Sequence, residues 1–178
     1  MALKSTIIKV ALSISDMDRH VYQDCTATIA QHPSETEQRM MIRVLAYALN
    51  YQPELVFTKG LCADDEPELW VKNYSDEIEV WIELGLPDDK RVKKACNRAK
   101  QVILYSYGEN NQTIWWQKNQ SKLAQFDNLT VVSLPYQATE QLARLAKRAL
   151  DLTITVQDGE IWLSDSEHSV HLVPTRLQ

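Results

Sequence analysis

The chain has 178 residues, a formal net charge of −5, 44% apolar residues and 4 glycines. This composition is typical of a globular protein with a substantial core, and the acidic balance does not favour a protein that coats nucleic acid through many phosphate contacts. It leaves room for an enzyme of nucleic acid with a local basic patch. The scarcity of glycine argues against glycine-rich phosphate loops.

Cysteine usage and hydropathy indicate the compartment. Cys25, Cys62 and Cys96 are widely spaced and form no CxxC pair. An odd number at this spacing does not predict a disulfide framework or a zinc cluster, so a reducing, cytoplasmic compartment is expected. The apolar run at the N-terminus is interrupted by Lys9, and no stretch approaches the ~20 apolar residues of a membrane helix. We therefore expect no membrane partner.

The apolar pattern predicts strand hairpins combined with strand–helix–strand crossovers. In chain order, the predicted elements are strands at 3–15 and 21–31, a helix at 32–51, a short buried strand at 54–60, strands at 68–72 and 78–84, a helix at about 88–100, a central strand at 101–108, a helix at 111–126, a strand at 128–135, a helix at 137–151 and a closing hairpin at 152–165. Asp158 and Gly159 form the dipeptide that two-residue hairpin turns favour. This order predicts a single domain, residues 1–178, with a mixed α/β sheet flanked by helices. The terminal hairpins are expected to pair as a small second sheet.

The helix at 32–51 has the clearest start signal in the chain. Ser34 is its predicted N-cap, and Glu37, three residues later, completes a capping box. Arg39 and Arg43 lie one turn apart on this helix. They are expected either to hold a phosphate or to pair with Glu35 and with the acidic loop at 61–68.

Residues 67–85 predict two strands joined by a polar turn, and each strand carries a carboxylate. Alternate residues of a strand share a face, so Glu68 shares a face with Trp70, and Glu83 shares one with Trp81. If the strands pair antiparallel, Glu68 and Glu83 meet at the open end of the hairpin. Two carboxylates there can hold Mg²⁺, which prefers one or two carboxylates with water and phosphate oxygens. The alternative interpretation is an ordinary solvent-exposed hairpin face.

The order of these acids also carries a resemblance. Pro67 and Glu68, then a hairpin, then Glu83 and Gly85 before a helix and a strand, resemble the PD-(D/E)XK nuclease pattern. Over nearly its whole length, the chain resembles the YaeQ family of bacterial proteins. The segments that carry this resemblance are 33–49, 79–108 and the tryptophans at 115 and 116. The resemblance implies a restriction-endonuclease-like fold with extra strands, and it implies the fold more strongly than the function.

The resemblance also implies roles for individual acids. Glu68 would take the place of the first acid of the motif, unless Asp64 or Asp65 in the adjacent loop does so. Glu83 would be the second acid. Glu37 would be the helical glutamate that completes the metal site, with the capping box as its alternative role.

The lysine of the motif is missing, because Gly85 stands two residues after Glu83. In some members of the superfamily the lysine moves to the following helix, and the resemblance implies Lys94 as the catalytic replacement. The helical wheel does not favour Lys94, since it lies opposite the predicted buried side. Lys72, on the face of Glu68, is another candidate. The helix cations are expected to bind nucleic-acid phosphates, or to form only a solvated face; they are Lys90, Arg91, Lys94 and Arg98.

Two functions follow from these residues and from the resemblance. The first is a Mg²⁺-dependent phosphodiesterase acting on nucleic acid, with Glu68, Glu83 and Glu37 as metal ligands and a helix cation that stabilises the charged transition state. The alternative is a catalytically inactive module on a nuclease-like scaffold, which binds nucleic acid or a protein partner. The retained acids favour the enzyme, whereas the missing lysine and the net charge favour the module.

Overall fold

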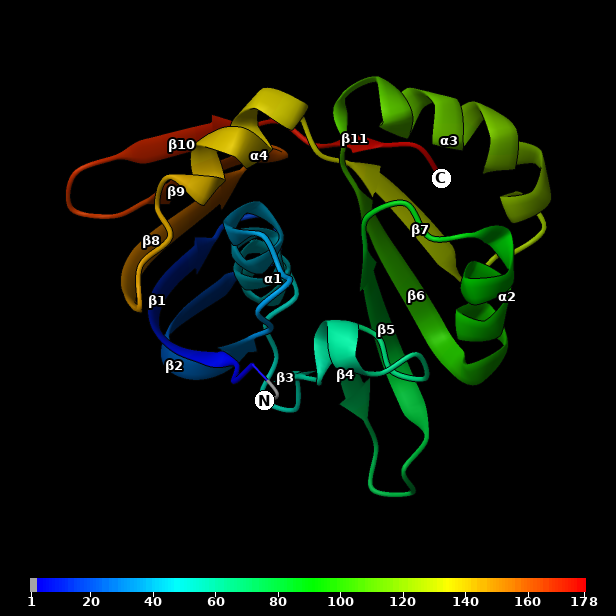
Figure 1. Cartoon of the computed structure of the whole chain (residues 1–178), viewed down its shortest axis with the longest axis horizontal. Helices are drawn as coiled ribbons and strands as arrows, with labels where there is room; N and C mark the ends of the chain where they lie inside the picture. Colours follow the sequence, from blue (N-terminus) through cyan, green and yellow to red (C-terminus); the bar gives the residue numbers. More distant parts are fainter. Residues whose placement is uncertain (1–2) are drawn as a thin grey trace. The chain divides into compact units, whose positions relative to one another are not determined.

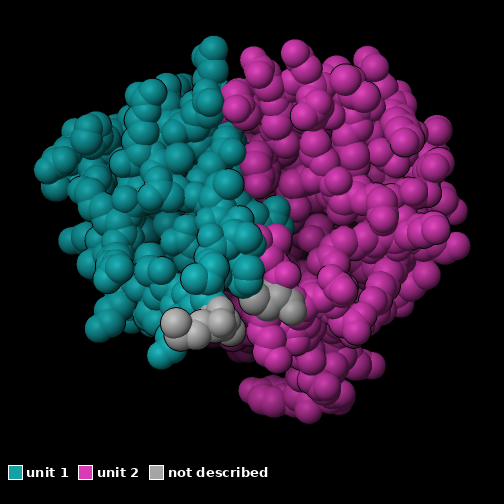
Figure 2. All heavy atoms as spheres, viewed as in Figure 1, with its two compact units in different colours: residues 1–51, 137–173 teal, residues 52–136, 174–178 magenta. Residues whose placement is uncertain are grey.

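The computed structural model describes residues 3–178, except for the side chain of Cys62, and the chain divides into two compact units (Figures 1 and 2). Unit 1 comprises residues 1–51 and 137–173, and unit 2 comprises residues 52–136 and 174–178. Each unit contains one mixed sheet, which confirms the predicted mixed α/β class. Since unit 2 is inserted into unit 1 along the chain, the single domain 1–178 stays a prediction.

The sheet of unit 1 has the strand order β10-β9-β8-β1-β2. Its strands are β1 (Thr6–Asp16), β2 (Val21–Gln31), β8 (Ala149–Gln157), β9 (Glu160–Ser164) and β10 (Ser169–Leu172). β1 pairs antiparallel with β2 and parallel with β8, so the two terminal hairpins join in one sheet as predicted. Asp158 and Gly159 have φ angles of 52° and 77°. Positive φ at both positions is the conformation of a type I′ hairpin turn, which confirms the predicted turn.

Two helices accompany this sheet. α1 (Glu37–Leu49) is buried continuously over residues 40–48 and packs against β1. Gln38 of α1 donates a hydrogen bond to Thr139 of α4 (Tyr136–Ala143) at 2.8 Å. α4 is shorter than the predicted helix at 137–151, because the chain enters β8 at Ala149 and alternates its buried side chains as a strand from there.

The start of α1 differs from the predicted capping box. Thr36 is the N-cap, and its hydroxyl accepts a hydrogen bond from the backbone N–H of Arg39 at 3.1 Å. The Ser34 hydroxyl instead lies 2.6 Å from Nδ1 of His32. A turn closed by the Glu35 N–H and the His32 carbonyl at 2.8 Å precedes the helix, so the helix begins later than predicted.

The sheet of unit 2 has the strand order β11-β7-β6-β5-β4-β3. Its strands are β3 (Val56–Phe57), β4 (Leu69–Lys72), β5 (Ile78–Leu84), β6 (Ala99–Ser106), β7 (Leu129–Ser133) and β11 (Thr175–Arg176). β6 is parallel to both β5 and β7, which confirms its predicted central place. The short strand predicted to be buried at 54–60 is an edge strand instead, and Val56 is 49% exposed.

Two helices pack on the sheet of unit 2. α2 (Asp89–Arg98) and α3 (Glu109–Leu123) share a buried cluster with the sheet, to which Val92, Cys96 and Leu123 contribute. Trp115 and Trp116 are both partly buried against this cluster, and the Trp115 indole N–H donates to the Pro87 carbonyl at 2.7 Å. Burial of the apolar side of α2 leaves its basic side chains on the opposite side.

Candidate functional site in unit 2

Glu68 directly precedes β4 and Glu83 lies near the end of β5, so both acids are at the open end of the β4–β5 hairpin. Leu69 pairs with Ile82, and the backbone N–H of Glu68 donates to the Ile82 carbonyl at 3.0 Å. Glu68 is thus hydrogen-bonded across to the residue that precedes Glu83, and its charge acts on the pKa of Glu83. The antiparallel pairing brings the two predicted acids together.

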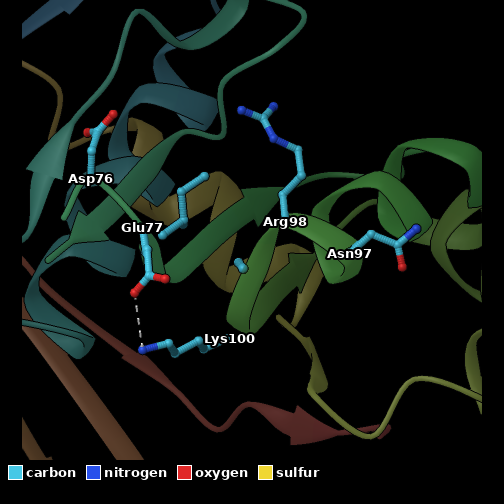
Figure 3. A pocket seen from close by; sticks show the side chains of 7 residues that line it. Asp76, Glu77, Asn97, Arg98 and Lys100 are labelled. Atoms are coloured by element: carbon cyan, nitrogen blue, oxygen red, sulfur yellow. Dashed lines mark ion pairs between the residues drawn. The ribbon is translucent and has the colours of Figure 1, made fainter.

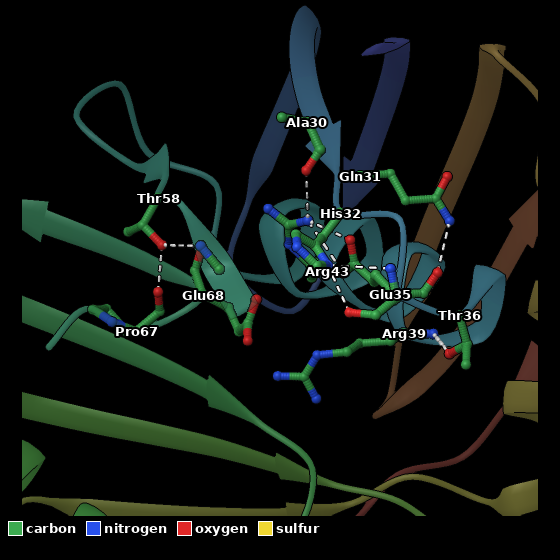
Figure 4. A network of polar contacts seen from close by, with 12 residues as sticks. Ala30, Gln31, His32, Glu35, Thr36, Arg39, Arg43, Thr58, Pro67 and Glu68 are labelled. Atoms are coloured by element: carbon green, nitrogen blue, oxygen red, sulfur yellow. Dashed lines mark hydrogen bonds and ion pairs between the residues drawn. The ribbon is translucent and has the colours of Figure 1, made fainter. Parts of the chain in front are cut away.

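Thr58, which directly follows β3, hydrogen-bonds to the end of the loop that leads into this hairpin. The Thr58 hydroxyl donates to the Pro67 carbonyl and also approaches the Glu68 carbonyl at 3.3 Å (Figure 4). The Thr58 N–H donates to the Glu68 carbonyl at 3.1 Å. These contacts fix the backbone of Glu68 at the point where its strand begins.

Both acids are buried, which contradicts the interpretation of an ordinary solvent-exposed face. Glu68 is 2% exposed and Glu83 is 4% exposed. Burial raises the pKa of Glu83 above its ordinary value, and the nearby charge of Glu68 adds to that rise. Arg91 and the Trp81 indole act in the opposite direction on the same pKa. The pair is thus an electrostatically coupled, largely desolvated site.

Both carboxylate oxygens of Glu83 have a donor from this unit. Arg91 Nε lies 3.1 Å from Oε1, and the Trp81 indole N–H donates to Oε2 at 3.1 Å. The two terminal nitrogens of the same guanidinium donate to the carbonyls of Asp64 and Glu66 at 3.0 and 2.9 Å. Arg91 therefore joins Glu83 to the acidic loop.

The other predicted cations of α2 lie at different places. Lys94 forms an ion pair with Asp65 and not with Glu83, and Arg98 donates to the Asp65 carbonyl at 2.9 Å. The guanidinium of Arg98 also lies over the Trp81 ring, 5.4 Å from its centroid. Lys90 is exposed.

Lys72, the other candidate for the missing lysine, lies at the far end of the hairpin from the acids. Its ammonium pairs with Asp76 at 3.0 Å and lies 4.1 Å from the centroid of the Trp70 ring. Arg91 is instead the cation that reaches Glu83. The sequence could have indicated Arg91, because a residue in the first turn of the helix that follows β5 lies close to the end of that strand.

A hollow of about 440 Å³ lies beside the start of β5 and the end of α2 (Figure 3). It is lined by Asp76, Glu77, Ile78, Asn97, Arg98, Ala99 and Lys100. Lys100 pairs with Glu79 at 2.7 Å and with Glu77 at 3.8 Å, so opposite charges neutralise each other around it. Neither Glu68 nor Glu83 belongs to this lining.

Glu37, the predicted third metal ligand, belongs to unit 1. It is exposed at the first turn of α1 and lines a hollow with Gln31, Lys147 and Arg148. Within residues 3–178, no group of three or more His, Cys, Asp or Glu side chains is arranged to hold a metal ion. Glu68 and Glu83 of unit 2 remain as a candidate pair of ligands at the open end of the hairpin.

Arg43 of unit 1 pairs with Glu35. This is the second of the two predicted roles, the first being to hold a phosphate. Arg43 is 2% exposed and Glu35 is 7% exposed. One guanidinium nitrogen lies 3.2 and 3.0 Å from the two carboxylate oxygens and 3.4 Å from the Ala30 carbonyl (Figure 4). This buried pair links α1 to the turn before it and to the end of β2.

Comparison with known proteins shows which family the chain is similar to. The model of the YaeQ protein family matches residues 1–174. The uncharacterized protein YaeQ of Escherichia coli (strain K12) is 47% identical over 178 residues, which cover 100% of this chain and 98% of that protein. The protein of the same name from Salmonella typhi is also 47% identical, with the same coverage.

Two solved structures are similar over nearly the whole chain. The crystal structure of the YaeQ protein from Xanthomonas axonopodis pv. citri has a TM-score of 0.96 at 42% identity and covers 98% of both chains. That of the YaeQ protein from Pseudomonas syringae has a TM-score of 0.93 at 34% identity, covering 98% of this chain and 96% of that one. Among the described residues, no helix combines the length and apolar character needed to cross a membrane.

Proposed function

The chain belongs to the YaeQ family. We propose that it is a Mg²⁺-dependent phosphodiesterase acting on nucleic acid, with a restriction-endonuclease-like scaffold. The observation that carries the proposal is the proximity of two buried carboxylates at the open end of the hairpin. Glu68 and Glu83 are 2% and 4% exposed, and the charge of Glu68 raises the pKa of Glu83. A divalent cation bound near two buried carboxylates lowers the cost of ionising both of them. The sequence of an acid-bearing hairpin, α2 and the parallel strand β6 supports the nuclease-like scaffold.

The donor chemistry of the two acids fits Mg²⁺. This ion is usually held by one or two carboxylates and completes its shell with water and phosphate oxygens, so the pair suffices in type and number. Glu83 first has to release one of its present donors, Arg91 on Oε1 or Trp81 on Oε2. Bound there, Mg²⁺ would supply a nucleophile made from water and offset charge on the phosphodiester.

The cations of α2 supply the rest of the proposed mechanism. A guanidinium released from Glu83 offsets negative charge that develops on the phosphate, which gives this role to Arg91. Lys94, the displaced lysine in the family resemblance, has to leave Asp65 before it can act in the same way. Lys90 and Arg98 are proposed to bind phosphates further along the backbone.

A catalytically inactive module that binds nucleic acid or a protein partner is the second candidate function. It is favoured by the donors that already engage both oxygens of Glu83, and by Gly85 at the position of the motif lysine. In that case Glu83 serves only to anchor Arg91 at the end of β5.

Glu83→Gln separates the two candidates, since it removes the charge and keeps the shape. Supercoiled plasmid and single-stranded RNA are incubated with the protein in Mg²⁺, in Mn²⁺ and in chelator. We expect metal-dependent cleavage that falls by roughly 100-fold or more in the variant, the upper end of what the loss of a partner around a metal costs. Glu79→Gln is the matched control on the same strand, where the carboxylate pairs with Lys100 instead of Arg91, and it should keep the activity.

The remaining outcomes are equally informative. Binding without cleavage in every metal, unchanged by Glu83→Gln, supports the inactive module. Circular dichroism spectra of both variants identify a loss of activity that comes from misfolding.

A further inference from the structure

The basic side of α2 is occupied by an acidic segment of the same unit, residues 63–66, which we name the acidic loop core. Arg91 donates to the carbonyls of Asp64 and Glu66 at 3.0 and 2.9 Å. Lys94 pairs with the carboxylate of Asp65. These donors are among the ones that the proposed function assigns to phosphates.

We propose that the acidic loop core is an intramolecular competitor, which covers the phosphate-binding side of α2 until a nucleic acid displaces it. The inference rests on the proposed function for its partner, a nucleic-acid backbone. Arg98 adds a further contact, because its guanidinium donates to the Asp65 carbonyl at 2.9 Å. Three of the four predicted phosphate-binding cations are thus engaged by one short segment.

The chemistry of the acidic loop core matches that of a phosphate backbone. It presents a row of oxygen acceptors, the carbonyls of three successive residues and the carboxylate of Asp65, to guanidinium and ammonium donors. Arginine and lysine use these same donors for phosphate oxygens. Lys94 lowers the pKa of Asp65 through its hydrogen bond and its charge, so Asp65 is ionised at neutral pH and acts as a fixed negative charge.

The contacts of the loop with α2 lie mainly at the surface, where a polyanion can exchange them, and only the bond from Arg91 to the Glu66 carbonyl is partly buried. The side chains of Lys94 and Asp65 are 42% and 80% exposed, and exposed ion pairs contribute little to stability. Residues 63–66 belong to no strand or helix. Their own backbone contacts are long, with Ala63 N–H at 3.2 Å from the Gly60 carbonyl and Glu66 N–H at 3.4 Å from the Ala63 carbonyl. The loop can therefore leave α2 without breaking the sheet.

Displacement of the loop also changes the surroundings of the paired acids. Two of the guanidinium nitrogens of Arg91 contact the loop, while its Nε contacts Glu83. A polyanion that replaces the loop would therefore bind the Arg91 guanidinium, whose Nε also contacts Oε1 of Glu83. Displacement of the acidic loop core thus couples the binding of a nucleic-acid backbone to Glu83, the proposed metal ligand.

The test is the affinity of the full chain for a short fluorescein-labelled DNA duplex, measured by anisotropy in chelator so that no cleavage occurs. Asp65→Asn should tighten binding by roughly two- to five-fold, the equilibrium factor of one surface ion pair. It should also steepen the slope of log affinity against log salt by about one, since Lys94 gains a phosphate. Asp127→Asn is the control, because it removes the same charge from an exposed position in the same unit.

A second pair of variants separates the contact from general electrostatics. In a Lys94→Gln background, Asp65→Asn should tighten binding less than it does in the wild type, because its ion pair is already lost. Equal tightening by Asp65→Asn and Asp127→Asn, or equal affinity of every protein, overturns the competitor and leaves the proposed function standing. Absence of binding by every protein at low salt overturns both. Tighter binding by Asp65→Asn without any metal-dependent cleavage supports the competitor and removes the catalytic proposal alone.

Discussion

Glu83 is a carboxylate on which burial and its partners act in opposite directions. Its 4% exposure favours the protonated form, whereas Arg91 at 3.1 Å and the Trp81 N–H at 3.1 Å favour the charged form. The net result is a pKa above the ordinary value of 4.5, with burial as the largest cause. The folded protein consequently binds this proton more tightly than the unfolded chain does, and stability contributed by Glu83 falls as the pH rises.

The pH dependence of stability tests this balance. The cost of ionising Glu83 is absent below its ordinary pKa and fully present above its raised pKa. We expect the free energy of unfolding of the wild type to fall relative to Glu83→Gln as the pH rises from about 4 towards neutrality. Urea denaturation of both proteins at a series of pH values measures it.

Glu79→Gln provides a control of opposite sign. Lys100 lowers the pKa of Glu79 through a hydrogen bond, so the charged form of Glu79 is favoured by folding, and the wild type should gain stability relative to this variant over the same rise in pH. If the wild type also gained stability relative to Glu83→Gln, the effect of Arg91 on the pKa of Glu83 would exceed that of burial.

The buried pair of Arg43 and Glu35 leads to a second prediction at this scale. Removal of one partner leaves the other charge desolvated, so Arg43→Met should lower the free energy of unfolding by about 3–5 kcal/mol. Lys147→Met breaks a pair in which the lysine side chain is 51% exposed, and it should cost less than about 1 kcal/mol. Urea denaturation of both variants makes the comparison, and equal costs would contradict the buried role of Arg43.

At the scale of elements, sequence patterns identified most strands and helices but misplaced two helix ends. Residues 137–151 have the composition of a helix, yet Ala149, Leu150 and Asp151 pair with β1. A weak helix propensity is readily overridden by strand pairing with a partner far along the chain. Ser34 and Thr36 are both favourable N-cap residues, and the turn at residues 32–35 decided between them.

The N-cap can be tested directly. Thr36→Ala removes the side-chain acceptor of the Arg39 N–H, and we expect it to lower the free energy of unfolding by about 1 kcal/mol. Ser34→Ala keeps this cap and should cost clearly less. Denaturant unfolding of the two variants measures the difference, and the reverse order would restore the capping box that begins at Ser34.

At the scale of the whole molecule, two sheets, one in each unit, are built from a chain that leaves unit 1 and returns to it. Ile154 of β8 and Leu104 of β6 are each 0% exposed, one in each unit. Truncation to alanine at such sites costs about 2–5 kcal/mol. The effect of each truncation on the other unit measures how far the two cores depend on each other.

Hydrogen exchange followed by mass spectrometry makes that measurement. We expect Ile154→Ala to accelerate exchange in β1 and β8, and Leu104→Ala to accelerate it in β5 and β7, since each removes contacts from its own core. Equal acceleration in both units by either variant would instead indicate the single cooperative domain that the sequence predicts.

The sequence by itself determined the features that depend on short-range chemistry. These are the alternation of the strands, the turn at Asp158 and Gly159, the apolar side of α2, and the hairpin that has Glu68 and Glu83 at its open end. Only the tertiary structure decided that both acids are buried, that Arg91 rather than Lys94 reaches Glu83, and that the acidic loop core lies on α2. Periodicity assigns a residue to a face, whereas burial and the choice of ion-pair partner depend on which distant segments pack against that face.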